Sequence, residues 1–444
     1  MKSIFLFLKD SLVHHDDIFM TEHMYGNKSV VIIGLKSLID ISRTNQAIQQ
    51  QLLETNLSAN ASLEQLQEIG EKITDKEQAM TAIFEGNLLI YLGKESEYLL
   101  RVIPINKEIQ RAIESPSNET ILQGSHYAFN EDRDVNIGII RKEIISDKLK
   151  VKNISIGQEI TRGVSLVYYE TKADQHIVGK VVQLLEQNTS KGFNNIQELM
   201  QLLGLPLLSI ISQVHTTELP QEASSALLKG KIILFVDRIP FALILPSVIG
   251  DMFMLENDRN YTYPLMIAIR LLRIIAFLVT LILPGLYVAL VSVNPEVLRI
   301  ELALSVAQSR NGVPYPAFIE IMIMLIILEL ILEASVRLPK SVGPTITMVG
   351  GIILGQAVVE AKLVSNLLII ILAAVTIANS SIVGVQNSAS IRIFKYIVLI
   401  FSASFGVLGI LVGLFFVCSY LASINTFGVP YLNINFSKDD LKNG

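Results

Sequence analysis

The run Ile274-Ile-Ala-Phe-Leu-Val-Thr-Leu-Ile-Leu-Pro-Gly-Leu-Tyr-Val-Ala-Leu-Val-Ser-Val293 contains no charged side chain. A helix of about 20 residues crosses the roughly 30 Å hydrocarbon core of a bilayer, because each residue adds about 1.5 Å. Arg270 and Arg273 come just before the run, where basic residues commonly mark a membrane boundary. The stretch therefore predicts a membrane-spanning helix, and it decides the fold class of the C-terminal half.

Charged residues are distributed unevenly around this stretch. Residues 1–230 hold 22 Lys/Arg and 29 Asp/Glu, whereas residues 260–421 hold only 9 and 6. We therefore expect a soluble α/β domain over residues 1–250, followed by an α-helical transmembrane bundle of four to six spans over 260–424 and a polar tail over 425–444. The net charge of -5 and the acidic soluble half argue against a nucleic-acid partner.

Four more segments are apolar enough to span a bilayer, namely 317–336, 342–359, 363–385 and 396–421. If the first four spans alternate, the basic pairs at 270/273, 337/340 and 392/395 fall on one side, which predicts that this side is cytoplasmic. The N-terminal apolar run is too short for a signal peptide, so we expect the N-terminal domain on that side too. The tail would then lie outside if the last segment spans once. Residues 294–316 form either an interfacial helix or a loop.

The soluble half shows alternating strand and helix patterns, which are typical of an α/β or an α+β domain. Ser29-Val-Val-Ile-Ile-Gly34 reads as a buried strand, and the turn Glu85-Gly86-Asn87 suggests a hairpin over residues 80–90. If the soluble half consists of two subdomains, we expect the division at a break near 114–130. Residues 231–245 are apolar except for Asp237-Arg238, a pair that would cost several kcal/mol in a lipid-facing helix. We therefore predict a hairpin there.

No motif in the sequence indicates catalysis. The chain has no phosphate-binding loop and no His-Glu-x-x-His or Gly-x-Ser-x-Gly motif, and its six histidines lack ligand spacing. Its single cysteine, Cys418, excludes a disulfide framework and a cysteine-based metal site. We expect a protein that is not an enzyme and that needs no cofactor and no metal.

Three carboxylates lie in the predicted span 317–336. A carboxylate in a span is costly, and it usually faces a bundle interior or a water-filled path, so Glu320, Glu329 and Glu333 are ion-path candidates. The alternative is structural, with Glu333 paired to Arg337 one turn away and Glu320 at the membrane interface. Glu329 is two turns from Arg337, too far to pair with it along the helix. We therefore predict that Glu333 is structural and that Glu329 lies nearer the ion path.

Glycines recur at helical spacing in two other predicted spans. The first set is Gly350, Gly351 and Gly355, and the second is Gly406, Gly409 and Gly413. Each contains a G-x-x-x-G spacing, which allows close helix packing in lipid. Helix packing is the simpler interpretation, and a gating hinge is the alternative.

Several runs together resemble the spore germinant receptor A-subunit family, the GerA family. The most specific are Glu329-Leu-Ile-Leu-Glu-Ala-Ser-Val-Arg-Leu-Pro-Lys340, Val349-Gly-Gly-Ile-Ile-Leu-Gly-Gln-Ala357, Gly230-Lys-Ile-Ile-Leu-Phe-Val-Asp-Arg-Ile-Pro-Phe-Ala-Leu-Ile-Leu-Pro246, Leu283-Pro-Gly-Leu-Tyr-Val-Ala289, Phe129-Asn-Glu131 and Phe427-Gly-Val-Pro-Tyr431. The chain departs from the family pattern at Gln123-Gly-Ser-His126 and at Thr217-Glu-Leu-Pro220.

The resemblance implies a multi-pass protein of the spore inner membrane that acts with B and C receptor subunits. It also implies a homo-oligomer in the lipid bilayer that conducts cations when the partner B subunit binds a small nutrient. The alternative is a non-conducting scaffold or signalling subunit of the same complex. A secondary transporter is a weaker possibility, because no internal repeat of spans is visible.

Overall fold

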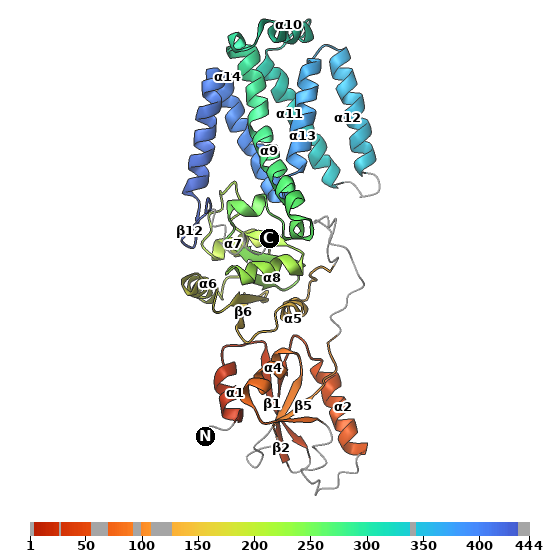
Figure 1. Ribbon diagram of the computed structural model, residues 1–444, viewed down its shortest axis with the longest axis vertical. Helices are drawn as coiled ribbons and strands as arrows, with labels where there is room; N and C mark the ends of the chain where they lie inside the picture. The colour runs from red at the N-terminus through yellow and green to blue at the C-terminus, as the bar shows by residue number, and fades with distance from the viewer. Residues whose placement is uncertain are drawn as a thin grey trace. The chain divides into compact units, whose positions relative to one another are not determined.

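The computed structural model describes residues 4–25, 28–54, 70–91, 99–107, 127–337 and 343–433 (Figure 1). The chain forms two compact units, each described by itself below. The first unit comprises Met1–Leu208, Gln213–Ser247 and Thr426–Gly428, and the second comprises Ser209–Ser212, Val248–Asn425 and Val429–Gly444.

The first unit begins with a five-stranded sheet of order β1-β2-β4-β5-β3, and its strand pairs are antiparallel. Its strands are β1 (Ile18–Tyr25), β2 (Lys28–Leu35), β3 (Glu71–Ile73), β4 (Leu88–Tyr91) and β5 (Leu99–Val102). The accompanying helices are α1 (Ile4–Leu12), α2 (Ile41–Glu54) and α4 (Lys76–Phe84). The predicted strand Ser29–Gly34 is confirmed as part of β2, and its apolar side chains join the core.

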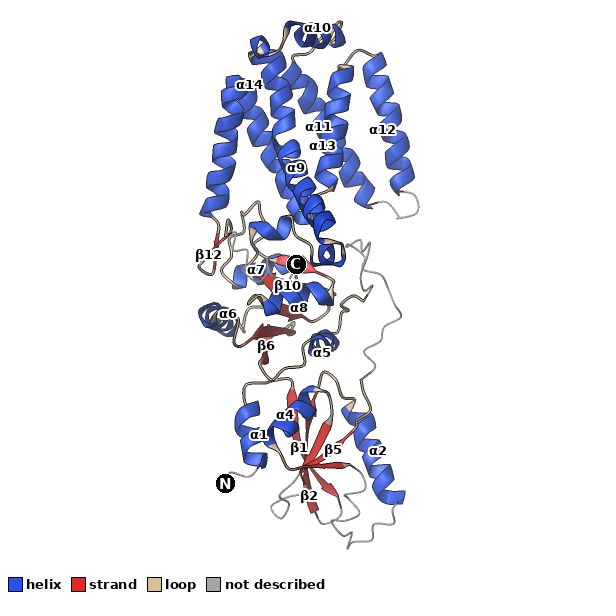
Figure 2. Ribbon diagram, in the orientation of Figure 1, coloured by secondary structure: helices blue, strands red, loops and turns tan. Residues whose placement is uncertain are grey.

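A second antiparallel sheet follows, of order β6-β7-β9-β10-β8 (Figure 2). Its strands are β6 (Leu149–Ile156), β7 (Arg162–Tyr169), β8 (His215–Thr217), β9 (Ile232–Val236) and β10 (Ala242–Leu245). Its helices are α5 (Arg133–Glu143), α6 (Gln175–Gln187), α7 (Ile196–Leu202) and α8 (Pro220–Leu228). The two sheets are separated in sequence by residues 108–126, which lie outside the described residues, so most of the predicted break at 114–130 falls there.

One predicted hairpin of the first unit is confirmed and the other is wrong. β9 and β10 pair in antiparallel register around the turn at Asp237-Arg238, and every residue of both strands is buried. Residues 80–84, by contrast, end helix α4. Asp75 caps this helix by accepting from the Gln78 N–H at 3.2 Å, and Gly86 follows it with φ +92°. The Glu85-Gly86-Asn87 turn is thus a helix C-terminus, because glycine adopts the left-handed conformation that ends helices.

The second unit is helical. Its α-helices are α9 (Tyr263–Val288), α10 (Ile300–Ser309), α11 (Ala317–Arg337), α12 (Gly343–Glu360), α13 (Asn366–Ser380) and α14 (Val385–Ser423). Short helical turns occur at η1 (Ile249–Met252), η2 (Glu256–Asn260), η3 (Ala289–Val293) and η4 (Pro295–Val297), and the short strands β11 (Asn425–Thr426) and β12 (Val429–Pro430) follow α14. The run quoted at the outset lies in α9 and η3, and the helix begins eleven residues earlier than predicted.

Membrane character is concentrated in two of these helical segments. Within the described residues, Tyr263–Val293 and Val385–Ser423 have the length and apolar composition of membrane spans, while Asn366–Ser380 is apolar but shorter. Large apolar side chains point outward from these helices; examples are Leu271, Leu272, Ile370, Ile377, Leu408 and Phe415. This pattern suggests membrane association. The predicted number of four to six spans remains a prediction.

Helix α14 differs from the single span predicted over 396–421. Gly406 has non-helical dihedral angles, φ 61° and ψ -136°, in the middle of the helix. On either side of it, the Phe394 and Tyr420 rings lie 5.7 Å apart, and Gly413 packs against Val398. α14 is therefore a helical hairpin, with one arm over 385–405 and the other returning over 407–423.

Candidate functional site

Among the described residues of the helical unit, the most deeply buried carboxylate belongs to Glu320, in the first turn of α11. Its side chain has no exposed surface, and it accepts from the Ser365 backbone N–H at 2.6 Å and from the Tyr287 hydroxyl at 3.3 Å. The Arg310 guanidinium lies 3.3 Å away and supplies a positive charge. Ser365 caps α13, so the carboxylate also lies at a helix N-terminus, which favours negative charge. The structure thus places Glu320 among α9, α11 and α13.

Glu329 has two cationic partners on another helix. Its carboxylate oxygens lie 2.7 Å from Arg392 Nη1 and 2.9 Å from Lys395 Nζ, both on the first arm of α14. Glu329 is too far from Arg337 to pair with it along α11, and its two partners are instead 63 and 66 residues away in sequence. This charge triad of Glu329, Arg392 and Lys395 joins α11 to α14. In the sequence, Arg392 and Lys395 stand out only as markers of membrane orientation.

Glu333 and Arg337 meet one turn apart on α11. Arg337 Nη2 lies 2.6 Å from Glu333 Oε1, and both side chains are mostly exposed. The three carboxylates of α11 therefore lie in three different surroundings, and Glu320 shares no partner with the other two.

The two glycine sets also differ. A Cβ at Gly351 or Gly355 would meet no atom within 4 Å, and Gly350 lies beside them on α12. In the second set, a Cβ at Gly409 would overlap the Phe401 carbonyl, and one at Gly413 would lie 2.8 Å from Val398 Cα. The second set therefore packs one arm of α14 against the other.

Asn294, which follows η3, has a role that the sequence does not indicate. Its carboxamide oxygen accepts from the Val407 N–H at 3.1 Å, at the start of the second arm of α14. A Cβ at Gly406 would collide with this same oxygen. Asn294 and Gly406 together build the hairpin turn. No local pattern in the sequence indicates this role, because Asn294 and Val407 are 113 residues apart.

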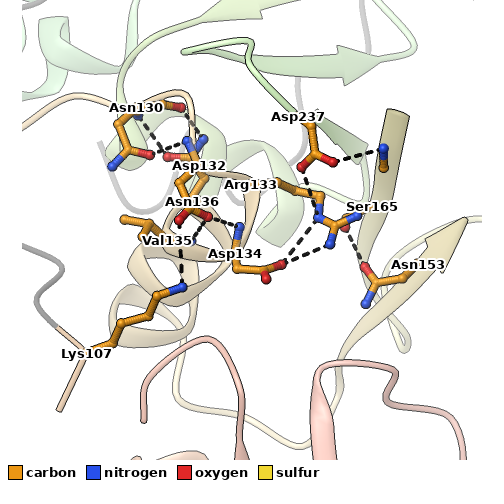
Figure 3. Close-up of polar contacts among 11 residues, drawn as sticks. Lys107, Asn130, Asp132, Arg133, Asp134, Val135, Asn136, Asn153, Ser165 and Asp237 are labelled. Atoms are coloured by element: carbon orange, nitrogen blue, oxygen red, sulfur yellow. Dashed lines mark hydrogen bonds and ion pairs between the residues drawn. The ribbon is translucent and has the colours of Figure 1, made fainter. Parts of the chain in front are cut away.

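The first unit holds a polar cluster around the start of α5 (Figure 3). Asp132 caps this helix by accepting from the Asp134 and Val135 N–H groups at 2.9 and 3.2 Å. Arg133 lies between two carboxylates, 3.1 Å from that of Asp134 and 3.6 Å from that of Asp237, in the β9–β10 turn. The cluster ties helix α5 to the hairpin, which is a structural role.

A second cluster of the first unit is more deeply buried. Arg141 on α5 is fully buried and donates two hydrogen bonds to Asp17, at 2.9 and 3.0 Å. His15 lies between two cations, with its ring nitrogens 3.3 Å from Arg141 Nη2 and 3.0 Å from Lys150 Nζ. The pKa of His15 is lowered from its ordinary value near 6.5 to about 3. Burial is the largest cause, because it disfavours the charged form, and the neighbouring positive charges are the next. His15 is therefore neutral at physiological pH.

Within the described residues, no group of three or more acidic, histidine or cysteine side chains could hold a metal ion.

Comparison with known proteins identifies the class to which these features belong. The family model described as "Bacillus/Clostridium GerA spore germination protein" matches residues 7–443. The chain therefore belongs to the GerA spore germination protein family, which confirms the resemblance found in the sequence.

The chain is also similar to individual relatives and to part of a solved structure. Spore germination protein A1 of Bacillus subtilis (strain 168) is 28% identical over 428 residues, covering 96% of this chain and 88% of the relative. Spore germination protein GerLA of Bacillus cereus is 32% identical over 387 residues, covering 87% and 76%. Among solved structures, the N-terminal domain of the A subunit of the Bacillus megaterium spore germinant receptor GerK3 matches 55% of this chain and 94% of its own length, with 21% identity and a TM-score of 0.41.

Proposed function

We propose that this chain is the A-type membrane subunit of a nutrient germinant receptor, and that it acts as a cation-conducting oligomer with B and C subunits in the spore inner membrane. Family membership over residues 7–443 supports the role in germination. In this proposal the first unit is cytoplasmic and the nutrient acts through the B subunit.

Conduction is supported by one observation above the others. Helices with apolar outward faces hold oppositely charged residues close together in two separate places, at Glu320 with Arg310 and at the charge triad of Glu329, Arg392 and Lys395. Charged groups at membrane depth are costly and commonly mark ion pathways. The unfilled space beside Gly351 and Gly355 on α12 supports oligomer formation, because small residues let a second helix approach closely.

The scaffold alternative interprets the same ion pairs as ties between helices. The two functions are separated by reconstituting the full-length chain with its B and C subunits into vesicles loaded with monovalent cations. Nutrient-triggered cation release is the expected result. A complex that assembles and binds nutrient but releases no cations would favour the scaffold.

The charge triad provides a variant for the same assay. Glu329→Gln should alter cation release per assembled complex if the triad borders the path, and Glu333→Gln is the matched control from the same helix. Equal release from both variants and from the parent protein would remove Glu329 from the ion path.

A further inference from the structure

An exposed apolar loop follows helix α7 in the first unit. We define it as the leucine loop, residues Leu205–Leu208. Leu208 is 95% exposed and Leu207 is 53% exposed, which is unusual for neighbouring leucines in a folded domain. Exposed apolar side chains that gather in one place mark contacts with membranes or proteins.

The leucine loop is held in place at both ends. At its start, the Leu205 N–H donates to the Met200 carbonyl at 3.0 Å, and the Gln197 side chain donates to the Leu207 carbonyl at 3.4 Å. At its end it continues directly into Ser209–Ser212, which belongs to the helical unit. Since its backbone is anchored, the exposure of the two leucines is a property of the fold.

The segment after the loop, Ser209–Ser212, has a defined level along the helices of its own unit. The Ile210 N–H donates to the Tyr420 hydroxyl at 2.8 Å, and the Ser390 hydroxyl donates to the Ile210 carbonyl at 2.6 Å. Ile211 is buried in the apolar cluster that contains Phe394 and Val417. Ile210 is thus bonded to both arms of α14, near the ends opposite the turn at Gly406.

This level corresponds to a bilayer boundary. Ser390 and Tyr420 are 16 and 14 residues from Gly406, which is about 24 and 21 Å along the two arms at 1.5 Å per residue. The hydrocarbon core is about 30 Å thick. When the Gly406 turn lies at one surface, Ile210 lies close to the other, and Leu208 is only two residues away.

We propose that the leucine loop inserts its two leucine side chains into the interfacial layer of the bilayer and so anchors the first unit at the lipid surface. The partner is lipid because Leu208 precedes Ile210 by only two residues, and Ile210 is hydrogen-bonded to the arms of α14, whose outward faces are apolar, as at Phe415 and Phe416. The proposal holds whether or not the chain conducts ions.

The test labels the loop with an environment-sensitive dye. Cys418 is first replaced by Ser, and Leu208→Cys is then labelled with nitrobenzoxadiazole in the full-length protein, reconstituted in phosphatidylcholine–phosphatidylglycerol vesicles. Ile103→Cys is the matched control, since Ile103 is an apolar residue of the first unit that is 84% exposed. Leu207→Cys serves as a second labelling position if the Leu208 variant is less stable than its parent.

The expected result is blue-shifted emission at position 208, with strong quenching by lipids that carry a nitroxide near the headgroup, and water-like emission at position 103. Water-like emission at position 208 would overturn the proposal. Blue-shifted emission that nitroxide lipids do not quench would also overturn it, because a second copy or another protein would then cover the loop. The assay needs neither nutrient nor cation flux, so its outcome is independent of the proposed channel function.

Discussion

Glu320, Glu329 and Glu333 lie on one helix, yet their carboxylates are neutralised in different ways. Glu320 is enclosed by a guanidinium, a hydroxyl and a backbone N–H, and Glu329 by two cations, whereas Glu333 has one exposed partner. Removing one member of a buried ion pair leaves its partner uncompensated, while removing one member of an exposed pair changes little. The loss of stability on substitution should therefore be larger for a more deeply buried carboxylate.

This difference predicts the effect of two substitutions on stability. Glu329→Gln leaves Arg392 and Lys395 facing each other, which should cost on the order of 2 kcal/mol, less than for a fully buried pair because the site is partly exposed. Glu333→Gln should cost about 0–1 kcal/mol. Thermal unfolding of the detergent-solubilised protein measures both. Adding Lys395→Met to Glu329→Gln should recover part of the loss, and equal melting temperatures for the two single variants would contradict the prediction.

The neutral His15 predicts a pH dependence of folding. The unfolded chain binds a proton at this histidine below pH 6.5, but the folded protein does so only near pH 3. The unfolded state therefore binds more protons as the pH falls, and the stability of the first unit decreases from pH 6.5 toward pH 3. The His15 contribution to that loss should reach about 2 kcal/mol at pH 5.

The His15 contribution is isolated by comparison with His15→Gln, which cannot be protonated there. Amide hydrogen exchange of α5 at pH 7 and pH 5 reports the local stability, after correction for the intrinsic exchange rates. Between pH 7 and pH 5, the parent protein should lose more protection against amide hydrogen exchange than the variant. Identical losses would show that burial between Arg141 and Lys150 does not control this titration.

At the element scale, the hairpin of α14 depends on glycine at its turn and along its inner face. The left-handed φ of Gly406 is readily adopted by glycine and disfavoured for other residues. Gly409 and Gly413 let the two arms approach until backbone touches backbone. Both conditions must hold for a chain to reverse direction within one residue and remain helical on either side.

This packing predicts opposite results for two Gly→Ala substitutions. Gly409→Ala places a methyl group against the Phe401 carbonyl, so it should lower the melting temperature of the detergent-solubilised protein by several degrees. Gly355→Ala meets open space and should be neutral, or stabilise α12 by up to about 1 kcal/mol through its higher helix propensity. A loss of oligomer with Gly355→Ala, at an unchanged melting temperature, would place α12 in a subunit contact. A harmless Gly409→Ala would contradict the hairpin packing.

At the scale of the whole molecule, the hairpin changes the expected membrane topology. If α9, α11, α12, α13 and both arms of α14 all cross the bilayer, the number of crossings is even. Residues Thr426–Gly428, which follow α14, belong to the first unit, where the Thr426 hydroxyl donates to the Gln213 carboxamide at 3.1 Å. The polar tail should therefore lie on the same side as the N-terminus, and not outside as a single last span would require.

Reporter fusions test this topology directly. Fusions after residues 340 and 433 should both report the cytoplasm, and a fusion after residue 311, between α10 and α11, should report the opposite side. A fusion at 433 that reports the outside would restore the single last span. A fusion at 311 on the cytoplasmic side would show that α9 does not cross.

The sequence by itself determined the family, the division into a charged half and an apolar half, strand β2 and the β9–β10 hairpin. These features depend on composition, on motif order or on residues close together in the chain, such as the Asp237-Arg238 turn. Only the tertiary structure decided that Glu329 meets Arg392 and Lys395, that Glu320 is enclosed by Arg310, Tyr287 and Ser365, and that α14 reverses at Gly406. The physical reason is distance along the chain. These ion pairs and close glycine contacts form where separate helices pack together, and the periodicity of a single helix does not show which helices will pack.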